Sequence, residues 1–228
     1  MFKCRINSIR KFCKKAALML MCMSFLFIAA CRDDDSDAAR FRKENEILNG
    51  QVSRDGQNYH KTLSIPRRNP FVFVDGYQVY DMLTTPGRSG IIYMGFPECP
   101  WCRALLPSLI DAVRESGWRG SVYHYNGLAD RDILRLDDYG EIEVLQEGQQ
   151  IYHQLVELLY DYLGPYIGLE DETIKRIYFP TTVFFRDGVV TSVHLGTIPS
   201  QTNGWEGLND EQAAELKEVL IAQIREIM

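Results

Sequence analysis

The distribution of apolar residues divides the chain into an apolar leader, a polar segment and a longer region of alternating strand and helix patterns. Residues 16–30 (AALMLMCMSFLFIAA) form an apolar run directly after Lys14 and Lys15. The run is shorter than the roughly 20 residues that a membrane-spanning helix needs, and it has a basic flank. We therefore predict that residues 1–30 are an export signal peptide.

Residues 31–66 are predominantly polar and contain blocks of charge, beginning with the stretch RDDDSD after Cys31. Few of their apolar positions repeat at a helical or strand period, apart from a short helical pattern at residues 41–48. A segment with so little apolar surface cannot bury a core of its own. The pattern predicts a flexible acidic tether between the leader and a folded domain at residues 67–228.

The first part of the folded domain alternates between strand and helix patterns. Helices are predicted at residues 77–83 and from Cys99 to about Gly117, where apolar positions recur at helical spacing. This βαβαβ order implies parallel pairing of the strands, with helices on the faces of the sheet. Three runs rich in β-branched and aromatic residues are the predicted strands: 71–74, 91–94 and 120–125.

The last part of the chain has the pattern of a β-hairpin and a helix. Strand patterns at residues 177–185 and 189–193 are separated by Arg186-Asp187-Gly188, which predicts a hairpin with a glycine-containing turn. Asn209 and Gln212 have the spacing of a capping box and precede apolar positions at helical spacing. The chain is therefore expected to end in a ββα unit.

Residues 126–172, between these two parts, show one strong helix pattern, at residues 149–163. The apolar positions of that helix share one face and are expected to be core. We therefore predict an α/β fold, βαβαβ followed by ββα, with a helical insertion at about residues 126–172.

The distribution of charge narrows the classes of partner that the domain can bind. The chain has 228 residues, and its 25 Lys and Arg and 31 Asp and Glu give a formal net charge of −6. Six of the bases and none of the acids lie in the first 30 residues, so 19 bases and 31 acids remain, a formal charge of −12. A domain this acidic repels phosphate backbones, which argues against nucleic-acid binding.

Cys99 and Cys102 are the two cysteines of the folded domain, and they lie at the start of its second predicted helix. Two intervening residues at that position let the sulfurs reach bonding distance. The free N–H groups and the positive dipole end of the helix stabilise a thiolate on the first cysteine. Thiolate is the attacking species in disulfide exchange. We therefore expect Cys99 to be exposed and reactive, and Cys102 to be shielded and to resolve the mixed disulfide.

A zinc site is the alternative that one CxxC motif leaves open, because such a motif is also half of a zinc site. The chain has no second CxxC motif. We expect no metal and no other cofactor, so the redox-active group is expected to be the cysteine pair itself. The four histidines also lack the spacing of metal ligands: His60, His124, His153 and His194.

The folded region resembles the thioredoxin superfamily, and the resemblance rests on more than the two cysteines. Members of that superfamily have a proline five residues after the second cysteine, and Pro107 stands there. They also have a cis-proline in a Pro-Thr segment beside the dithiol, which Pro180-Thr181 matches. Thioredoxins proper have glycines eight and sixteen residues after that proline, which Gly188 and Gly196 match. The resemblance covers about residues 70–228.

The resemblance implies a thioredoxin fold and a role for each residue of the site. It implies that Cys99 is the nucleophile, that Cys102 is the resolving thiol, and that an extended substrate docks beside Pro180 in its cis form. Phe179 and Trp101 are further candidates for substrate binding, because they adjoin that proline and separate the cysteines. A core position fits Phe179 equally well.

The sequence departs from thioredoxins at positions that bear on the direction of exchange. Tyr93 stands where thioredoxins have a buried aspartate that helps to move the proton of the resolving thiol. Glu98 is the nearest carboxylate that could replace it, although an exposed surface position is the simpler interpretation. Pro100-Trp101 replaces the Gly-Pro of thioredoxins, closer to the Cys-Pro-aromatic-Cys of glutaredoxins, but no basic pocket for glutathione is evident. These differences favour oxidation or isomerisation of substrate thiols over reduction.

The end of the leader, Ile28-Ala29-Ala30-Cys31, resembles the lipobox of bacterial lipoproteins. In such proteins the cysteine is lipidated and becomes the mature N-terminus. The resemblance implies that Cys31 anchors the protein to a membrane of the cell envelope. Two alternatives stay open, namely cleavage by an ordinary signal peptidase near Ala30 and an uncleaved membrane anchor.

These features together predict a monomeric thiol–disulfide oxidoreductase that is tethered to a membrane outside the cytoplasm. Its expected partners are cysteine-containing exported proteins or a membrane redox partner. The alternative is a thioredoxin-like binding or accessory module, similar to the small exported proteins associated with bacteriocin production, with little or no turnover. The presence of both cysteines at a helix start favours the oxidoreductase, since a pure binding module needs neither thiol.

Overall fold

The computed structural model describes residues 36–59 and 62–228 of the chain. The expected signal peptide at residues 1–30 and the expected lipidation site Cys31 lie outside the described residues.

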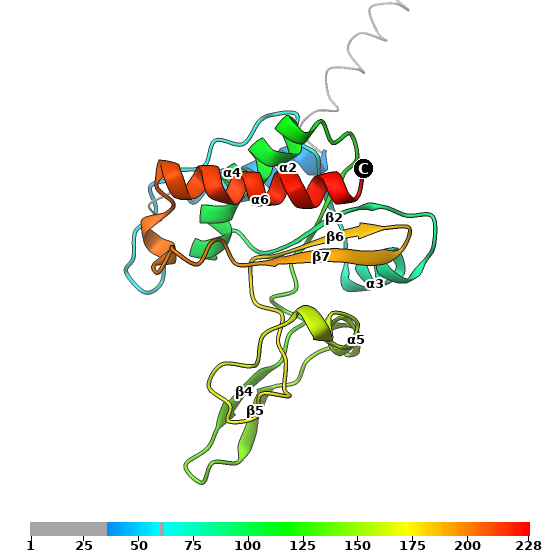
Figure 1. Cartoon of the computed structure of the whole chain (residues 1–228). Helices are drawn as coiled ribbons and strands as arrows, with labels where there is room; N and C mark the ends of the chain where they lie inside the picture. The colour runs from blue at the N-terminus through cyan, green and yellow to red at the C-terminus, as the bar shows by residue number, and fades with distance from the viewer. Residues whose placement is uncertain (1–35, 60–61) are drawn as a thin grey trace, which may run out of the picture.

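The centre of the fold is a mixed five-stranded sheet in the order β1-β3-β2-β6-β7 (Figure 1). The first three strands in this order pair in parallel, and β6 and β7 continue the sheet in antiparallel fashion. The prediction of an α/β fold is confirmed, as is the parallel pairing of its first three strands. The strands are β1 (Phe71–Phe73), β2 (Gly90–Met94), β3 (Val122–Tyr125), β6 (Thr181–Arg186) and β7 (Val189–Leu195).

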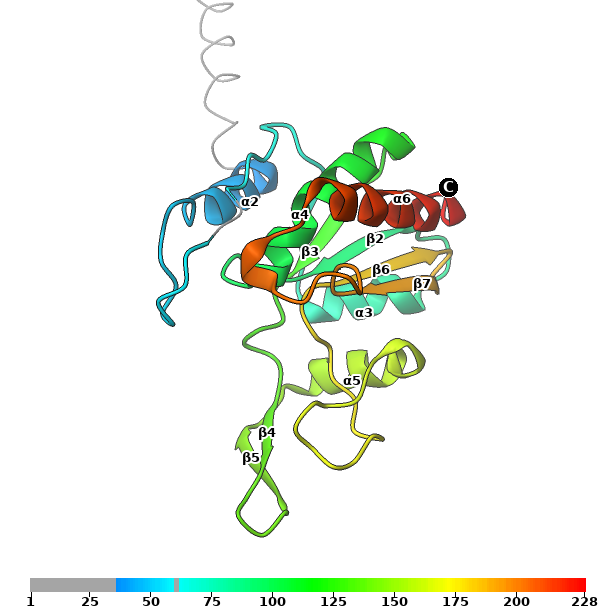
Figure 2. The ribbon, with the colours of Figure 1, turned by 60° about the vertical axis from the view of Figure 1, so that its left-hand side comes forward.

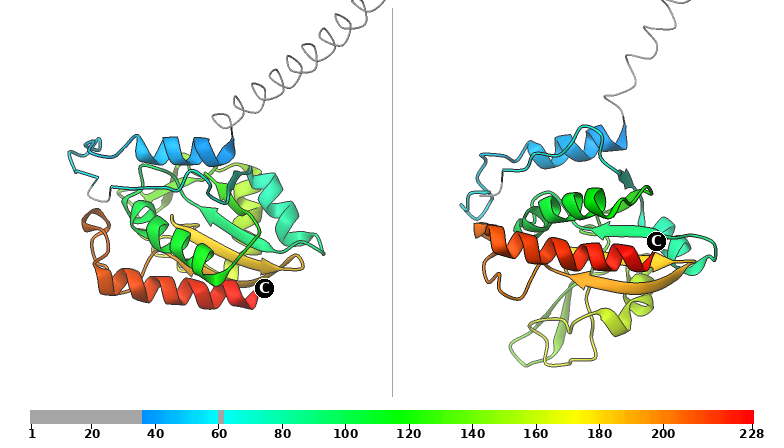
Figure 3. Two further views of the ribbon diagram at one scale, coloured as in Figure 1. Left: turned by 90° about the horizontal axis from the view of Figure 1, so that it is seen from above. Right: turned by 45° about the horizontal axis from the view of Figure 1, so that its top comes forward.

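Helices cover both faces of this sheet (Figures 1 and 3). On one face lie α2 (Asp37–Glu46), α4 (Pro100–Ser116) and α6 (Asp210–Glu226), and on the other lie α3 (Gly76–Thr84) and α5 (Gln150–Leu158). Successive residues of β2 point to opposite faces of the sheet and pack in different cores. Ile91 and Tyr93 pack in the core under α4 and α6, whereas Ile92 and Met94 pack in the core with α3 and α5. A strand buried on both faces explains the continuous apolar run in the sequence.

The β6–β7 hairpin has a two-residue turn at Asp187 and Gly188, both with positive φ (53° and 74°). Positive φ at both central residues suits the right-handed twist of a hairpin and favours an Asp-Gly pair. The hairpin was predicted correctly, but β6 begins later than expected, at Thr181. Pro180 has no N–H to donate to a sheet, so the strand cannot extend back through it.

The N-terminal segment, residues 36–59 and 62–66, corrects the prediction of a flexible tether. Its helix α2 places Phe41 against the sheet, fully buried, with its ring stacked on that of Phe71 at a centroid distance of 3.8 Å. Leu63 and Ile65 are buried in the same core. The prediction failed because α2 buries one apolar side chain, Phe41, which is too few to produce a clear helical period in the sequence.

The insertion at residues 126–172 differs from the expected helical insertion, because it also contains strands. It contains a two-stranded antiparallel ribbon, β4 (Ile133–Leu136) and β5 (Ile142–Gln146), which extends away from the sheet (Figure 2). The predicted helix at residues 149–163 is divided into α5 and a 3-10 turn, η1 (Tyr160–Tyr162). The ribbon gave little sequence signal because all five residues of β5 are exposed, so burial imposes no alternation on them.

Candidate active site

Cys99 is the N-cap residue of α4 and lies after the loop that leaves β2. Its sulfur accepts a hydrogen bond from the backbone N–H of Cys102 at 3.2 Å, so it satisfies one of the free N–H groups at the helix start. Pro100 is the first helical residue, where it needs no N–H partner. Cys99 is only 5% exposed and Cys102 is fully buried, so the expectation of an exposed Cys99 is wrong. The side chain reaches solvent through a cavity instead.

The surroundings of the two thiols change their pKa values in opposite directions. The pKa of Cys99 is lowered, chiefly by the hydrogen bond from the Cys102 thiol, with the N–H groups at the helix start and the charge of Arg131 adding to the effect. The pKa of Cys102 is raised well above its usual value, chiefly by burial and then by its interaction with Cys99. Cys99 is therefore the thiol that ionises first, and Cys102 retains its proton.

The loop that precedes β6 lies directly beside Cys99. The Cys99 thiol donates to the carbonyl oxygen of Phe179 at 3.5 Å, and the Phe179–Pro180 peptide bond is cis, as the sequence resemblance implied. The Phe179 ring is half-buried and meets Phe96 edge to face, with ring centroids 5.5 Å apart. Four of the predicted site residues, Cys99, Cys102, Phe179 and Pro180, therefore come together in space.

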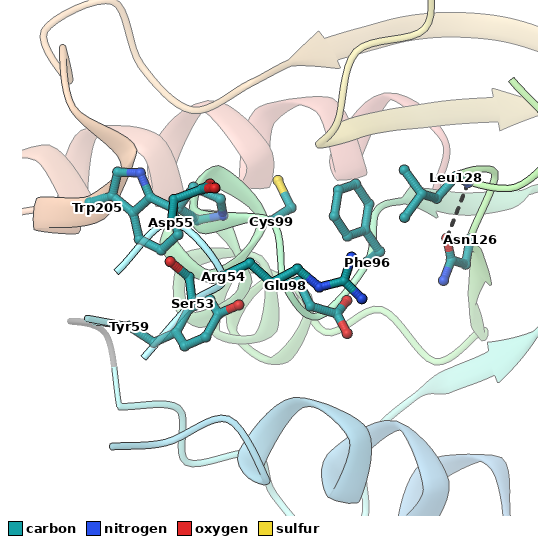
Figure 4. A pocket seen from close by; sticks show the side chains of 11 residues that line it. Ser53, Arg54, Asp55, Tyr59, Phe96, Glu98, Cys99, Asn126, Leu128 and Trp205 are labelled. Carbon is teal, nitrogen blue, oxygen red and sulfur yellow. Dashed lines mark hydrogen bonds between the residues drawn. The ribbon is translucent and has the colours of Figure 1, made fainter. Parts of the chain in front are cut away.

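A cavity of about 620 Å³ includes Cys99 in its wall (Figure 4). Trp101, a predicted substrate-binding residue, does not line it, because its ring packs against Gly204 in the 3-10 turn η2 (Gly204–Glu206). Trp205 from the same turn lines the cavity in its place. The residues that line the cavity come from four segments of the chain: Ser53, Arg54, Asp55, Tyr59, Phe96, Glu98, Cys99, Pro100, Asn126, Leu128 and Trp205.

Tyr93 is fully enclosed beneath the dithiol, and its hydroxyl interacts with the Cys102 thiol. Burial raises the pKa of Tyr93 well above its usual value, so the hydroxyl stays protonated. Gly95 lies against both groups, and a larger residue would not fit there, because a Cβ would lie 3.0 Å from the Cys102 sulfur and even closer to the Tyr93 side chain. The site therefore has a neutral hydroxyl at the position where the proteins that the sequence resembles have a carboxylate. Glu98 is exposed, as expected.

Two arginines near the dithiol were not predicted. Arg131, from the base of the insertion, lies 5.8 Å from the Phe179 ring centroid and favours the ionised form of Cys99. Arg103 follows Cys102 in α4 and is only 2% exposed. Its guanidinium donates to the Asn45 carbonyl and the Asn49 side-chain oxygen, each at 2.8 Å. Neither arginine stands out in the sequence, because the partners of both are distant along the chain.

Within residues 36–59 and 62–228, no group of three or more His, Cys, Asp or Glu side chains is arranged to hold a metal ion. Two histidines there bind carbonyl oxygens, since a ring nitrogen of His124 lies 2.9 Å from the oxygen of Gly95 and one of His194 lies 2.8 Å from that of Thr197. None of the helices in this described part has the length and apolar character needed to cross a membrane.

Comparison with protein-family models and with curated proteins gives no match for this chain. The geometry of the site is therefore the basis for inferring what the protein does.

Proposed function

We propose that this protein is a thiol–disulfide oxidoreductase with a thioredoxin fold, in which Cys99 attacks and Cys102 resolves. The observation that carries the proposal is the unequal environment of the two thiols at the start of α4. The Cys99 sulfur accepts hydrogen bonds that favour its thiolate, whereas Cys102 is buried and stays protonated. A stabilised thiolate beside a protonated partner thiol is the arrangement that two-step disulfide exchange requires.

The sheet order and the position of the site support the finer assignment of the fold. Strand order β1-β3-β2-β6-β7 puts the dithiol, which follows β2, next to the loop that precedes β6. Pro107 lies inside α4, at the position that the resemblance implies. The N-terminal segment and the insertion are then additions to a thioredoxin-like domain.

The exchange proceeds in two steps in which bonds and charges balance. The Cys99 thiolate attacks one sulfur of a substrate disulfide, which forms a mixed disulfide and releases the other substrate sulfur as a thiolate. Cys102 transfers its proton to the substrate thiolate released in the first step, and its sulfur attacks the Cys99 sulfur, which forms the Cys99–Cys102 disulfide and releases the second substrate thiolate. Two electrons pass from the cysteine pair to the substrate. The reverse sequence oxidises a substrate dithiol.

For the net direction, we propose oxidation or isomerisation of substrate thiols. Hydrogen bonds that stabilise the Cys99 thiolate stabilise the reduced form of the pair, which makes the disulfide a stronger oxidant. The buried neutral hydroxyl of Tyr93 also provides no carboxylate to take the proton of Cys102. Both features make the reduced Cys99–Cys102 pair a weaker reductant.

We also propose that Cys31 is lipidated and holds a monomeric domain at a membrane outside the cytoplasm, where exported proteins with cysteines, or a membrane redox partner, meet it. Two or more acyl chains on one residue bind a membrane durably. Replacing the cysteine in Cys31→Ser is expected to leave unprocessed precursor or released protein. Unchanged membrane association with a cleaved N-terminus would exclude the lipid anchor.

The test of the function is to trap substrates and to measure the potential of the pair. Cys102→Ser is expected to accumulate mixed disulfides through Cys99, because the resolving thiol is missing, whereas Cys99→Ser is expected to accumulate none. The potential of the wild-type pair is expected to lie above about −270 mV, the thioredoxin value. Trapping in Cys99→Ser alone would reverse the two roles. A potential at or below that value would indicate a reductase.

The second candidate, a binding module without turnover, is favoured by one observation, the 5% exposure of Cys99. Substitution of both cysteines by serine separates the candidates. A binding module keeps its partner in Cys99→Ser/Cys102→Ser, whereas an oxidoreductase loses all trapped adducts.

A further inference from the structure

One wall of the cavity comes from a short loop of the N-terminal segment, residues 51–59, which we name the strap. The strap closes on itself through backbone hydrogen bonds, from Tyr59 to Gln51 at 3.2 Å and from Ser53 to Gln57 at 2.8 Å. The tip of the strap, including Arg54, lines the same cavity as Cys99 (Figure 4). A segment that the sequence suggested was a tether thus forms part of the surroundings of the reactive sulfur.

The strap is attached to the active-site helix by Arg103. The guanidinium of this residue lies 5.2 Å from the Tyr59 ring centroid and hydrogen-bonds Asn45 and Asn49, which precede the strap. Arg103 directly follows Cys102 in α4, so the strap and the resolving cysteine share one rigid support. The wall is therefore held in place relative to the dithiol.

The cavity wall is rich in aromatic rings that come from separate parts of the chain. Tyr59 of the strap lies 5.6 Å from Trp205 between ring centroids, and Phe96 lines the cavity from the loop before Cys99. Aromatic side chains give large contact areas at a low cost in conformational entropy, which is why they dominate recognition surfaces. This composition suits an apolar side chain of a ligand.

The charged residues of the lining show which ligands do not fit. Arg54, Asp55 and Glu98 give one positive and two negative formal charges around the cavity. A ligand with several carboxylates therefore meets net repulsion, whereas an uncharged or basic peptide does not.

We infer that the strap and Trp205 form a recognition site for extended polypeptide segments that carry an aromatic or large aliphatic side chain next to the cysteine. This inference rests on the proposed function. Its chemistry is the first exchange step, in which the Cys99 thiolate bonds to the peptide sulfur and the other sulfur of the peptide disulfide leaves as a thiolate. The neighbouring apolar side chain of the peptide packs against Trp205 and Tyr59 during this attack.

The experiment compares two uncharged pentapeptides, each with one cysteine blocked as a mixed disulfide with 2-mercaptoethanol. One peptide has Trp and the other has Ser beside the cysteine. The full chain carrying Cys102→Ser is mixed with each peptide, and the Cys99 adduct is quantified by mass spectrometry of the proteolytic fragments. Bis(2-hydroxyethyl) disulfide, which has no side chain to recognise, reports the intrinsic reactivity of Cys99.

We expect the Trp peptide to react about tenfold faster than the Ser peptide, a difference of about 1.4 kcal/mol. Trp205→Ala and Tyr59→Ala should each reduce this preference to below about threefold, because each removes one ring of the wall. Each peptide rate is divided by the rate of the same variant with the hydroxyethyl disulfide, so that the preference is corrected for any change in the reactivity of Cys99. A measurable rate with this small disulfide also shows that the dithiol site is still folded. The control Tyr139→Ala removes a ring that is 90% exposed, on the loop between β4 and β5, and should keep the full preference.

Two failures of the experiment can be told apart. If Cys99 reacts with the hydroxyethyl disulfide but shows no preference between the peptides, the recognition site is refuted and the proposed function stands. A preference that persists in both Trp205→Ala and Tyr59→Ala also refutes it. If Cys99 does not react even with the hydroxyethyl disulfide, the proposed function fails and the inference fails with it.

Discussion

The N-terminal segment and the insertion are both added to the same α/β core, but they relate to it in opposite ways. The N-terminal segment packs its buried Phe41 on β1 and lines the cavity at Cys99. The insertion reaches the site only at its base, through residues such as Arg131, and its β4–β5 ribbon extends into solvent. The comparison teaches that an added segment reaches the candidate site through a few buried contacts, not through its length or its regular structure.

Phe41→Ala should produce the largest effect, because it removes the buried ring that fixes α2 to the sheet. We expect a loss of about 3 to 5 kcal/mol in the free energy of unfolding. Denaturant unfolding measures it, with Tyr139→Ala as the control on the exposed ribbon. A loss below about 0.5 kcal/mol, typical of a surface position, would mean that α2 is not part of the core.

Acidification should produce the next largest effect, through His124, whose ring lies beside those of Phe41 and Phe73. Burial lowers the pKa of His124 from 6.5 to about 4, so the folded state holds the neutral ring. The unfolded state takes up the proton first, so the contribution of His124 to stability is complete above pH 6.5 and is lost as the pH falls towards 4. The loss should approach about 3 kcal/mol.

Urea midpoints at pH 7 and pH 4.5 measure this contribution. His124→Gln should flatten the dependence on pH, whereas His153→Gln, at an exposed position, should leave it unchanged. If the urea midpoint falls equally between pH 7 and pH 4.5 in the wild type, His124→Gln and His153→Gln, then His124 is not shielded by the N-terminal segment.

Arg131→Gln tests the contribution that the insertion makes to the charge around the dithiol. Loss of the positive charge should raise the pKa of Cys99, because that charge favours the thiolate. Thiolate absorbance against pH in a Cys102→Ser background measures the change. Arg135→Gln is the matched control, since this arginine is paired with Glu143 on the ribbon at 2.6 Å. If Arg135→Gln raises the pKa of Cys99 as much as Arg131→Gln does, the change comes from the net charge of the insertion and not from the position of Arg131.

Ile142→Ser and Val144→Ser in β5 should have the smallest effect. Both side chains are substantially exposed, so each substitution should change the free energy of unfolding by less than about 0.5 kcal/mol. The rate at which Cys99 reacts with a small disulfide should also be unchanged. A larger destabilisation would show that the ribbon packs on something in solution and would remove the contrast between the two added segments.

The features that the sequence predicted well are those determined by neighbouring residues. The turn at Asp187 and Gly188 needs positive φ at both positions, and Asn209 and Gln212 form the capping box of α6 with each other. The position of Cys99 at a helix start follows in the same way from the residues around it. Each of these features is local, so a short stretch of sequence contains all the information that it requires.

The features that the sequence did not predict depend on partners that are distant along the chain. Tyr59 meets Trp205, and Arg103 binds Asn45, and no periodicity links either pair. The ring of Trp101 lies away from the cavity and against Gly204, where the missing Cβ leaves room for the indole. The site could therefore be located from the sequence, but its walls could not.

The early start of α2 limits how far the domain can travel from a membrane. The helix begins at Asp37, so if Cys31 carries the proposed lipid anchor, only five residue-to-residue steps separate the lipid from Ser36. Even a fully extended chain covers no more than about 18 Å over that interval. A domain anchored in this way stays within a thin layer at the bilayer surface. The cysteines within its reach are then those of proteins that emerge from that membrane or lie on it.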